Sequence, residues 1–259
     1  MAPRLGLVTY QLAKDWDVDT IIANCVEAGF EGVECRTTHA HGVEVSLSAA
    51  QRDEVKAKFA QSPVTLAGLG SAFEYDAVDG DELRTHIEGT KQYAQLAADV
   101  GCPGVKVRPN GIHVDEGVPI DKTLEQIGLA LGECGAFAKE LGVEIRLEVH
   151  GRVTCEPPHI RTILAHADSD NVFACWNSNM QECDESGSID ASYRLLEKDI
   201  RLVHITELWS EYPWGRLFEL LNDSGYDGFM LAEIPESADA LRLMKYYRAL
   251  WLAHGARGR

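Results

Sequence analysis

Short β-rich runs alternate with long helical patterns along the whole chain, and this alternation restricts the fold more than any other feature. Repeated strand–helix pairs predict βα units and a parallel sheet rather than a β-sandwich. The predicted strands lie at about 4–9, 31–36, 63–70, 104–108, 143–150, 172–177, 201–206 and 228–233. The predicted helices are Val18–Ala28, Ala49–Ala60, Asp81–Val100, Ile120–Leu141, Pro158–Ala167, Ile189–Leu196, Trp214–Asn222 and Ala238–Leu252. Eight such units close a (β/α)8 TIM barrel, which is the α/β fold we predict.

Glycines that follow predicted helices repeat along the sequence. Gly29, Gly101, Gly142 and Gly225 each stand just after a helix and just before a strand, where a left-handed glycine closes the helix. Their spacing corresponds to roughly two, one and two βα units, which favours the barrel over a doubly wound sheet. No linker or low-complexity segment divides the chain, so we predict one domain over residues 1–259. The segment from Gly68 to Gly70 lacks the third glycine of a dinucleotide-binding motif.

The charge of the chain limits its partners. With 24 Lys and Arg against 41 Asp and Glu, the formal net charge is −17, which opposes binding to a phosphate backbone and argues against nucleic acid. The longest apolar runs fall short of the roughly 18 residues of a membrane span. The seven cysteines form no C-x-x-C pair and suit a reducing compartment. We expect a cytoplasmic protein, although a leader removed beforehand would leave the same sequence, and a homo-oligomer is left open.

Polar residues follow the alternation that points into a barrel. Successive strand residues face opposite sides, and the carboxyl ends of barrel strands carry the active site. Ile145, Leu147 and Val149 would pack on helices, which turns their neighbours inward. The same parity predicts these inward polar residues: Glu34, Arg36, Lys106, Arg108, Arg146, Glu148, His150, Asn177, His204 and Glu233.

Glu148, Asn177, His204 and Glu233 lie on consecutive strands, at or near their carboxyl ends. Taken singly, a Glu there is more often a salt-bridge partner and a His more often a core residue. Together, buried carboxylates need a counter-charge, and a divalent cation supplies one. We therefore predict one divalent metal ion held by these four residues. Carboxylate, amide and imidazole donors without thiolate suit Mn²⁺ foremost, or Mg²⁺ or Co²⁺, better than a structural Zn²⁺.

Four motifs resemble one known family over nearly the whole chain. They are Glu148-Val-His150-Gly, Trp176-Asn-Ser-Asn179, His204-Ile-Thr-Glu207-Leu and Ala232-Glu233. The sequence resembles the xylose-isomerase-like TIM barrels, which include sugar phosphate isomerases and epimerases. In that family a Glu, an Asp, a His and a Glu at the ends of strands five to eight hold one divalent metal, and the two Glu residues also serve as acid and base.

Glu148, His204 and Glu233 match this family pattern, and the resemblance implies that Glu148 and Glu233 are the catalytic pair. Asn177 stands where most members have Asp, and Met180 where the epimerase-like pattern has His. A neutral Asn177 leaves only two carboxylates against a 2+ charge. We therefore expect weaker metal binding and a stronger Lewis acid.

The resemblance implies a carbohydrate isomerase or epimerase that abstracts a proton next to a carbonyl through a metal-stabilised enediolate. A lyase or deglycosidase that expels a β leaving group from a keto-glycoside would use the same residues. A sugar-binding barrel without catalysis is a third interpretation, motivated by Asn177. DNA-repair endonucleases share the fold, but they need additional metal-binding His residues and the net charge opposes DNA.

Six further residues are candidates for binding the small carbohydrate substrate: His150, Lys106, Arg108, Arg36, His39 and Trp16. An aromatic ring such as Trp16 can stack on a sugar face. Lys106 and Arg108 could instead form ion pairs with Glu34 or Glu148. His39 and His41 could bind a second metal, but without an inward carboxylate nearby, substrate contact or loop structure is favoured.

Overall fold

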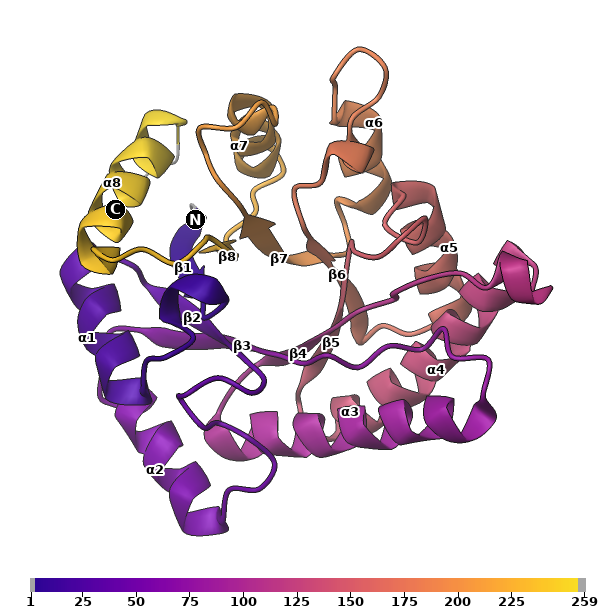
Figure 1. Cartoon of the computed structure of the whole chain (residues 1–259), viewed down its shortest axis with the longest axis horizontal. Coiled ribbons are helices and arrows are strands. Elements are labelled where there is room, and N and C mark those ends of the chain that lie inside the picture. Colours follow the sequence, from indigo (N-terminus) through magenta and orange to yellow (C-terminus); the bar gives the residue numbers. More distant parts are fainter. Residues whose placement is uncertain (1–2, 256–259) are drawn as a thin grey trace.

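The protein folds into a closed barrel of eight parallel strands surrounded by helices (Figure 1). The computed structural model describes residues 3–255. The strands are β1 (Arg4–Val8), β2 (Gly32–Arg36), β3 (Thr65–Gly70), β4 (Gly104–Val107), β5 (Glu144–Glu148), β6 (Val172–Trp176), β7 (Ile200–Ile205) and β8 (Phe229–Ala232). Each strand pairs with the next in sequence, and β8 pairs with β1 to close the barrel. The predicted (β/α)8 architecture is confirmed.

The outer ring consists of eight helices, each following one strand along the chain. They are α1 (Val18–Ala28), α2 (Ala49–Ala60), α3 (Gly80–Val100), α4 (Ile120–Glu140), α5 (Pro157–Ala167), α6 (Asp190–Leu196), α7 (Trp214–Asp223) and α8 (Ala240–Ala253). Element ends differ from the predictions by at most two residues. The largest consequence is at β5, which ends at Glu148, so that His150 lies in the loop after the strand rather than on it.

Helix ends follow the predicted capping chemistry. The Asp17 side chain accepts a hydrogen bond from the Thr20 amide at the start of α1. Gly29 and Gly101 close α1 and α3 with φ of 75° each, the left-handed conformation that glycine adopts without steric cost. Gly142 and Gly225 share this conformation, so all four glycine stops predicted from the sequence are confirmed.

The core has two layers, as the strand parity predicts. Ile145, Leu147 and Val149 are buried in the large cluster between strands and helices. A smaller apolar cluster comprises Val8, Ala67, Cys175, Leu202, Phe229 and Leu231, from five strands of the barrel. Six of the seven cysteines are buried as free thiols, and no disulfide forms among the described residues. Apolar side chains thus stabilise the barrel, and the polar residues predicted for the site lie at the ends of its strands.

Two glycines of β3 make room for a buried carboxylate. A Cβ atom added at Gly70 would lie 2.6 Å from Glu34 Oε1, and one at Gly68 would lie 3.1 Å from Glu34 Oε2. The glycine pair that resembles half of a dinucleotide motif therefore has a packing role: it lets the side chain of Glu34 occupy the barrel next to β3.

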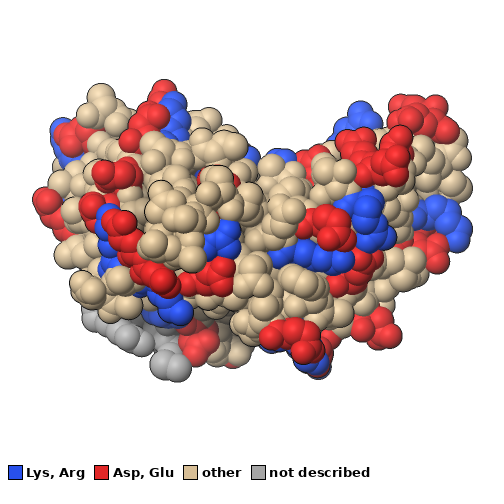
Figure 2. Space-filling model, turned by 90° about the horizontal axis from the view of Figure 1, so that it is seen from below, with Lys and Arg blue, Asp and Glu red and all other residues tan. Residues whose placement is uncertain are grey.

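The surface combines acidic and basic residues without separating them. On the face drawn in Figure 2, Lys and Arg side chains are interspersed with Asp and Glu, and no broad basic patch gathers there. The same view shows the surface hollowed at its upper edge between two raised parts. Among residues 3–255, no helix is both long enough and apolar enough to cross a bilayer.

Candidate active site

A cavity of about 470 Å³ opens where the strands end. Its lining comes from the ends of β1, β2, β4, β5, β6, β7 and β8 and the residues just after them. The lining residues are Tyr10, Arg36, Lys106, Arg108, Glu148, His150, Asn177, Asn179, Thr206 and Glu233. This is the face on which enzymes with this fold carry their active sites, because the βα loops there vary without disturbing the barrel.

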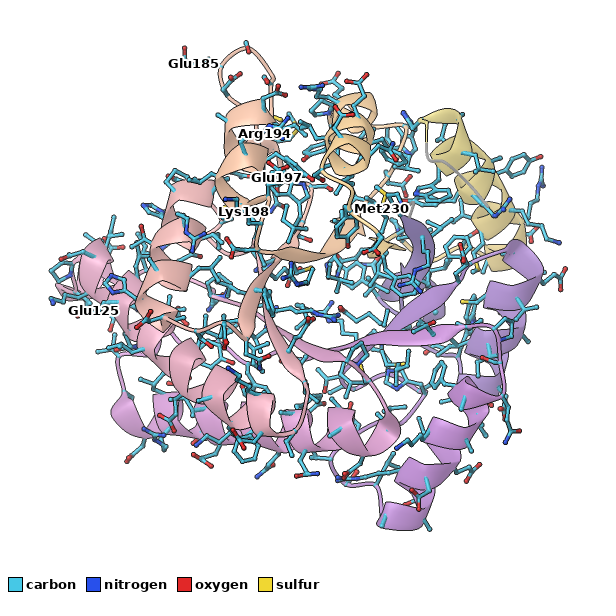
Figure 3. The ribbon with its side chains drawn as sticks, turned by 180° about the vertical axis from the view of Figure 1, so that it is seen from behind. Glu125, Glu185, Arg194, Glu197, Lys198 and Met230 are labelled. Carbon is cyan, nitrogen blue, oxygen red and sulfur yellow. The ribbon has the colours of Figure 1, made fainter. Side chains whose placement is uncertain are left out.

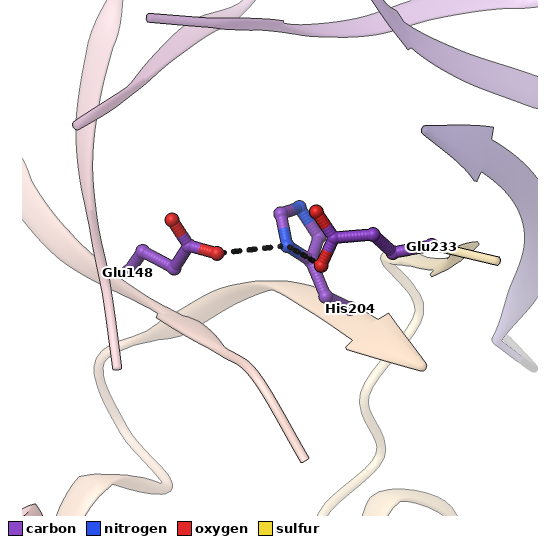
Figure 4. A group of neighbouring side chains, drawn as sticks. All are labelled: Glu148, His204 and Glu233. Atoms are coloured by element: carbon purple, nitrogen blue, oxygen red, sulfur yellow. Dashed lines mark ion pairs between the residues drawn. The ribbon is translucent and has the colours of Figure 1, made fainter. Parts of the chain in front are cut away.

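His204 is the centre of the candidate metal site (Figure 4). Its Nδ1 atom lies 3.4 Å from Glu148 Oε1 and 3.7 Å from Glu233 Oε2. One donor atom from each of the three side chains falls within 4.8 Å of the other two, which is close enough for all three to bind one ion. The structure therefore brings together three of the four residues predicted as ligands.

Two buried atoms that could bind a metal at this site have no hydrogen-bonding partner. His204 Nδ1 and Asn177 Oδ1 are both shielded from solvent and form no hydrogen bond within the described part of the chain. Unsatisfied buried polar atoms are costly and call for an explanation such as a bound ion. The donor set thus fits a divalent cation, with Asn177 in the lining of the same cavity as a candidate fourth ligand.

Glu34 contacts the second ring nitrogen of His204. His204 Nε2 lies 3.3 Å from Glu34 Oε2, and both side chains are fully buried. With its single proton on Nε2, a neutral imidazole would donate to this carboxylate and present the lone pair of Nδ1 to a metal ion. Metal-binding histidines typically donate their second nitrogen to a carboxylate in this way.

The two candidate catalytic carboxylates have different electrostatic surroundings. Burial disfavours ionised Glu148, but the Lys106 ammonium at 2.7 Å and the His204 imidazole outweigh it and hold the pKa of Glu148 well below its usual range. Burial raises the pKa of Glu233, helped by the charge of Glu148 and opposed by His204 and Lys106. One carboxylate is therefore stabilised as an anion while the other retains a proton more readily.

The groups around His204 favour a positive charge on it. Burial alone lowers its pKa, but the Cys175 side chain and the Glu34 and Glu148 carboxylates outweigh burial and hold the pKa of His204 well above its usual value. A divalent cation between His204 Nδ1 and the carboxylates would supply that positive charge in place of the proton.

Four of the six predicted substrate-binding residues line the cavity: Arg36, Lys106, Arg108 and His150. Lys106 forms the predicted ion pair with Glu148. Arg108 instead pairs with Glu74 at 2.6 Å, rather than with Glu34 or Glu148. The reason is that β4 ends at Val107, so the backbone of Arg108 leaves the strand and its amide donates to Phe73 O in the loop after β3.

Trp16 and His39 do not belong to the residues that line this cavity. Trp16 is half-buried and packs against the main apolar core. His39 Nδ1 lies 3.0 Å from Thr9 Oγ1. Both ring nitrogens of His41 are engaged by backbone groups, at Arg36 O and Val43 N, which makes His41 a residue of loop structure. Substrate contact by Trp16 and His39 stays a prediction.

The structure adds residues that the sequence did not single out as site residues. Tyr10, Asn179 and Thr206 line the cavity because each lies one to three residues beyond a strand end. The strand parity was the available signal, because Tyr10 lies two residues after the inward Val8, Asn179 two after Asn177 and Thr206 two after His204.

A buried chain of polar groups supports the loop after β6. Trp176 Nε1 donates to Tyr212 Oη at 3.0 Å, and Tyr212 Oη donates to Glu182 Oε2 at 2.5 Å. Burial raises the pKa of Glu182 to about 8, although hydrogen bonds from Tyr212 and from backbone groups at 177–179 oppose the rise. This carboxyl therefore ties the segment that carries Asn177 to the loop after β7.

Solved structures share this fold at low sequence identity. A 3-keto-D-glucoside 4-epimerase of E. coli matches with a TM-score of 0.80 and 15% identity over 97% of this chain and 99% of that chain. A D-psicose 3-epimerase of Clostridium cellulolyticum H10, solved with D-tagatose, gives 0.78 and 16% over 96% and 99%. The IolI protein with a bound zinc atom gives 0.73 and 13% over 97% and 96%. No curated protein matches the sequence significantly.

A family model described as the xylose isomerase-like TIM barrel matches residues 22–250, which is most of the chain. The match begins within α1 and ends within α8, and so includes every strand from β2 to β8 and all residues of the candidate metal site. The chain belongs to the xylose isomerase-like TIM barrel family.

Proposed function

We propose that this protein is a divalent-metal-dependent carbohydrate isomerase or epimerase that moves a proton on a carbon next to a carbonyl. Glu148 and Glu233 exchange that proton, and Glu148, Asn177, His204 and Glu233 hold the metal, with Mn²⁺ as the expected ion. The observation that carries the proposal is the pair of carboxylates on either side of His204 Nδ1, at 3.4 and 3.7 Å.

The two carboxylates reach the cavity from different strands. Glu148 ends β5 and Glu233 directly follows β8, so they approach a molecule in the cavity from separate directions. Removing a proton from one face of a carbon and returning one to the other face, as epimerisation requires, needs such an arrangement. A bound divalent cation would polarise the carbonyl as a Lewis acid.

The remaining lining residues support a polar substrate. His150, Asn179 and Thr206 offer neutral hydrogen-bonding groups to hydroxyls, and Tyr10 contributes an aromatic ring. The fold neighbours whose titles name sugar epimerases are consistent with a carbohydrate, and the zinc in a third neighbour is consistent with a metal in this type of barrel. These likenesses support the proposal, which rests on the residues of this chain.

Metal analysis and isotope exchange test the proposal together. Protein loaded with Mn²⁺ should contain one ion per chain, and His204→Gln should lose most of it. The matched control His166→Gln, in which an exposed histidine on α5 is changed, should bind metal normally. Failure of the wild-type protein to bind any divalent ion would overturn the metal site.

In D₂O, the loaded enzyme should incorporate deuterium next to the carbonyl of at least one member of a panel of ketoses, ketose phosphates and 3-keto-glycosides. Treatment with a chelator should stop the exchange. Release of the aglycone from a keto-glycoside would identify the lyase variant of the same proton abstraction. A loaded enzyme that binds members of the panel but exchanges none would contradict catalysis and favour a sugar-binding barrel.

A further inference from the structure

The guanidinium of Arg36 differs from the other cationic groups of the cavity. Lys106 Nζ is neutralised by Glu148 at 2.7 Å, and Arg108 by Glu74 at 2.6 Å. Arg36 forms no ion pair within residues 3–255, and its side chain donates no hydrogen bond there; its contact is with the ring of Tyr10, 5.1 Å from the ring centre. Arg36 is half-buried at the end of β2 and lines the cavity.

The charge balance of the loaded site leaves this guanidinium uncompensated. The cations in and directly beside the cavity are Arg36, Lys106 and Arg108, and the carboxylates are Glu34, Glu74, Glu148 and Glu233. With His204 neutral as a metal ligand, three positive and four negative groups leave one negative charge, and the divalent ion changes this to one net positive charge. An anionic ligand would therefore make the site neutral, although the whole chain carries −17.

Arg36 reaches the cavity from a strand that carries none of the candidate metal ligands. Those ligands come from β5 to β8 and the residues just after them, whereas Arg36 ends β2, which β1 separates from β8. A molecule held at Glu148 and Glu233 can therefore present a second group to Arg36 in the same cavity. The planar guanidinium donates parallel hydrogen bonds to two oxygens of one oxyanion, which a neutral hydroxyl cannot match.

We infer that the substrate is an anionic carbohydrate, whose carboxylate or phosphate group is bound by Arg36. This inference rests on the proposed function, since it names the substrate class of the same cavity. Tyr10 packs against the guanidinium and so restricts its orientation.

Three ketoses that differ only at carbon 6 test the inference: D-fructose, D-fructuronate and D-fructose 6-phosphate. Binding to the Mn²⁺-loaded protein is measured by calorimetry, without need of turnover. We expect at least one of the two anions to bind the wild-type protein about 10-fold or more tightly than D-fructose. The favoured anion shows whether the group is a carboxylate or a phosphate.

Variants test whether Arg36 causes the preference for an anionic ketose. Arg36→Gln should weaken binding of the favoured anion about 10–100-fold and that of D-fructose less than about threefold, whereas Arg36→Lys should retain part of the preference. Arg242→Gln, which removes an exposed arginine from α8 and makes the same change in net charge, should alter neither. Equal binding of all three ketoses, or a preference that survives in Arg36→Gln, would overturn the inference.

Deuterium exchange on the same three ketoses separates this inference from the proposed function. An anion that binds through Arg36 but never exchanges its hydrogen would leave the anion site intact and contradict the proposed chemistry. Exchange that proceeds equally with D-fructose and with both anions would support the chemistry and overturn the anion preference.

Discussion

The carboxylate of Glu148 is buried in the barrel, and its charge is tolerated because Lys106 Nζ lies 2.7 Å from Glu148 Oε2. The other oxygen, Oε1, faces His204. Glu148 therefore uses one oxygen for its counter-ion and offers the other to the candidate metal site. Removing one partner of a buried pair leaves an uncompensated charge, which costs far more than the pair itself contributes.

Lys106→Met should lower the free energy of unfolding of the metal-free protein by about 3–5 kcal/mol at pH 7. Lys139→Met, which breaks an exposed ion pair with Asp170, should have a much smaller effect, because solvent screens that pair. Urea unfolding in the presence of a chelator measures both. Since the pKa of Glu148 is depressed in the folded protein, its stabilising contribution is present above its unfolded pKa and is lost as the pH falls. Equal losses in the two variants would show that the buried pair matters no more than a surface pair.

Asn177 offers a second prediction at the scale of one residue. Its Oδ1 atom is buried and has no partner in the described structure, and it contributes no charge to the site. Asn177→Asp should therefore tighten divalent-metal binding about 10-fold or more, while lowering turnover because a third carboxylate weakens the pull of the metal on the substrate. A competition titration with a chelating dye measures the affinity. Unchanged or weaker binding would show that Asn177 is not a ligand.

At the scale of elements, the loop between β6 and α6 is held by a carboxyl that does not face the cavity. Glu182 is fully buried, and its pKa is raised to about 8 by burial. Between its unfolded pKa, near 4.5, and about 8, the folded chain binds more protons at this group than the unfolded chain. The stability contributed by Glu182 therefore falls as the pH rises through this window.

Glu182→Gln removes this dependence but keeps an oxygen that can accept from Tyr212 Oη. Relative to the wild-type protein, the variant should gain up to roughly 4 kcal/mol between pH 5 and pH 8, at about 1.4 kcal/mol per pH unit. Glu185→Gln is the matched control, because Glu185 is exposed at the tip of the same loop (Figure 3) and should show no such gain. Urea unfolding at pH 5 and pH 8 measures this gain. If the free energy of unfolding of Glu182→Gln and that of the wild-type protein change with pH in parallel, the raised pKa of Glu182 is contradicted.

Elements were predicted well where the signal is local. The alternation of Ile145, Leu147 and Val149 with polar residues fixes which side of β5 faces inward, because strand parity depends on the strand alone. The same parity extends past the strand ends, where Arg108, Asn177 and Glu233 line the cavity as predicted. It does not predict the ion-pair partner of Arg108, which is Glu74, because a contact between two loops depends on how both are folded.

At the scale of the whole molecule, the site depends on contacts that no local pattern contains. Glu34 and His204 are 170 residues apart in sequence, and in their contact across the barrel Nε2 of the histidine faces Glu34 while Nδ1 faces the candidate metal site. The sequence predicted both residues as inward, but not their contact, because the pairing across the lumen depends on how the closed barrel is staggered. The same holds for Gly68 and Gly70, whose role is apparent only beside Glu34.

The barrel also separates roles between its two halves. β5 to β8 supply the candidate metal ligands and the carboxylate pair, whereas β2 and β4 supply the cations Arg36 and Lys106. The closed ring of strands holds these groups at fixed positions around one cavity. The strand ends therefore position the proposed catalytic carboxylates and the candidate metal ligands on the barrel itself.

The most direct test of this account is the rate at which metal-loaded Glu148→Gln and Glu233→Gln exchange the hydrogen next to the carbonyl of a bound ketose with D₂O, measured by mass spectrometry. Each substitution preserves shape and an oxygen ligand but removes the exchangeable carboxyl proton. Exchange should fall about 10²–10⁴-fold in both variants and stay unchanged in Glu185→Gln. Wild-type exchange in both variants, with metal fully bound, would contradict it.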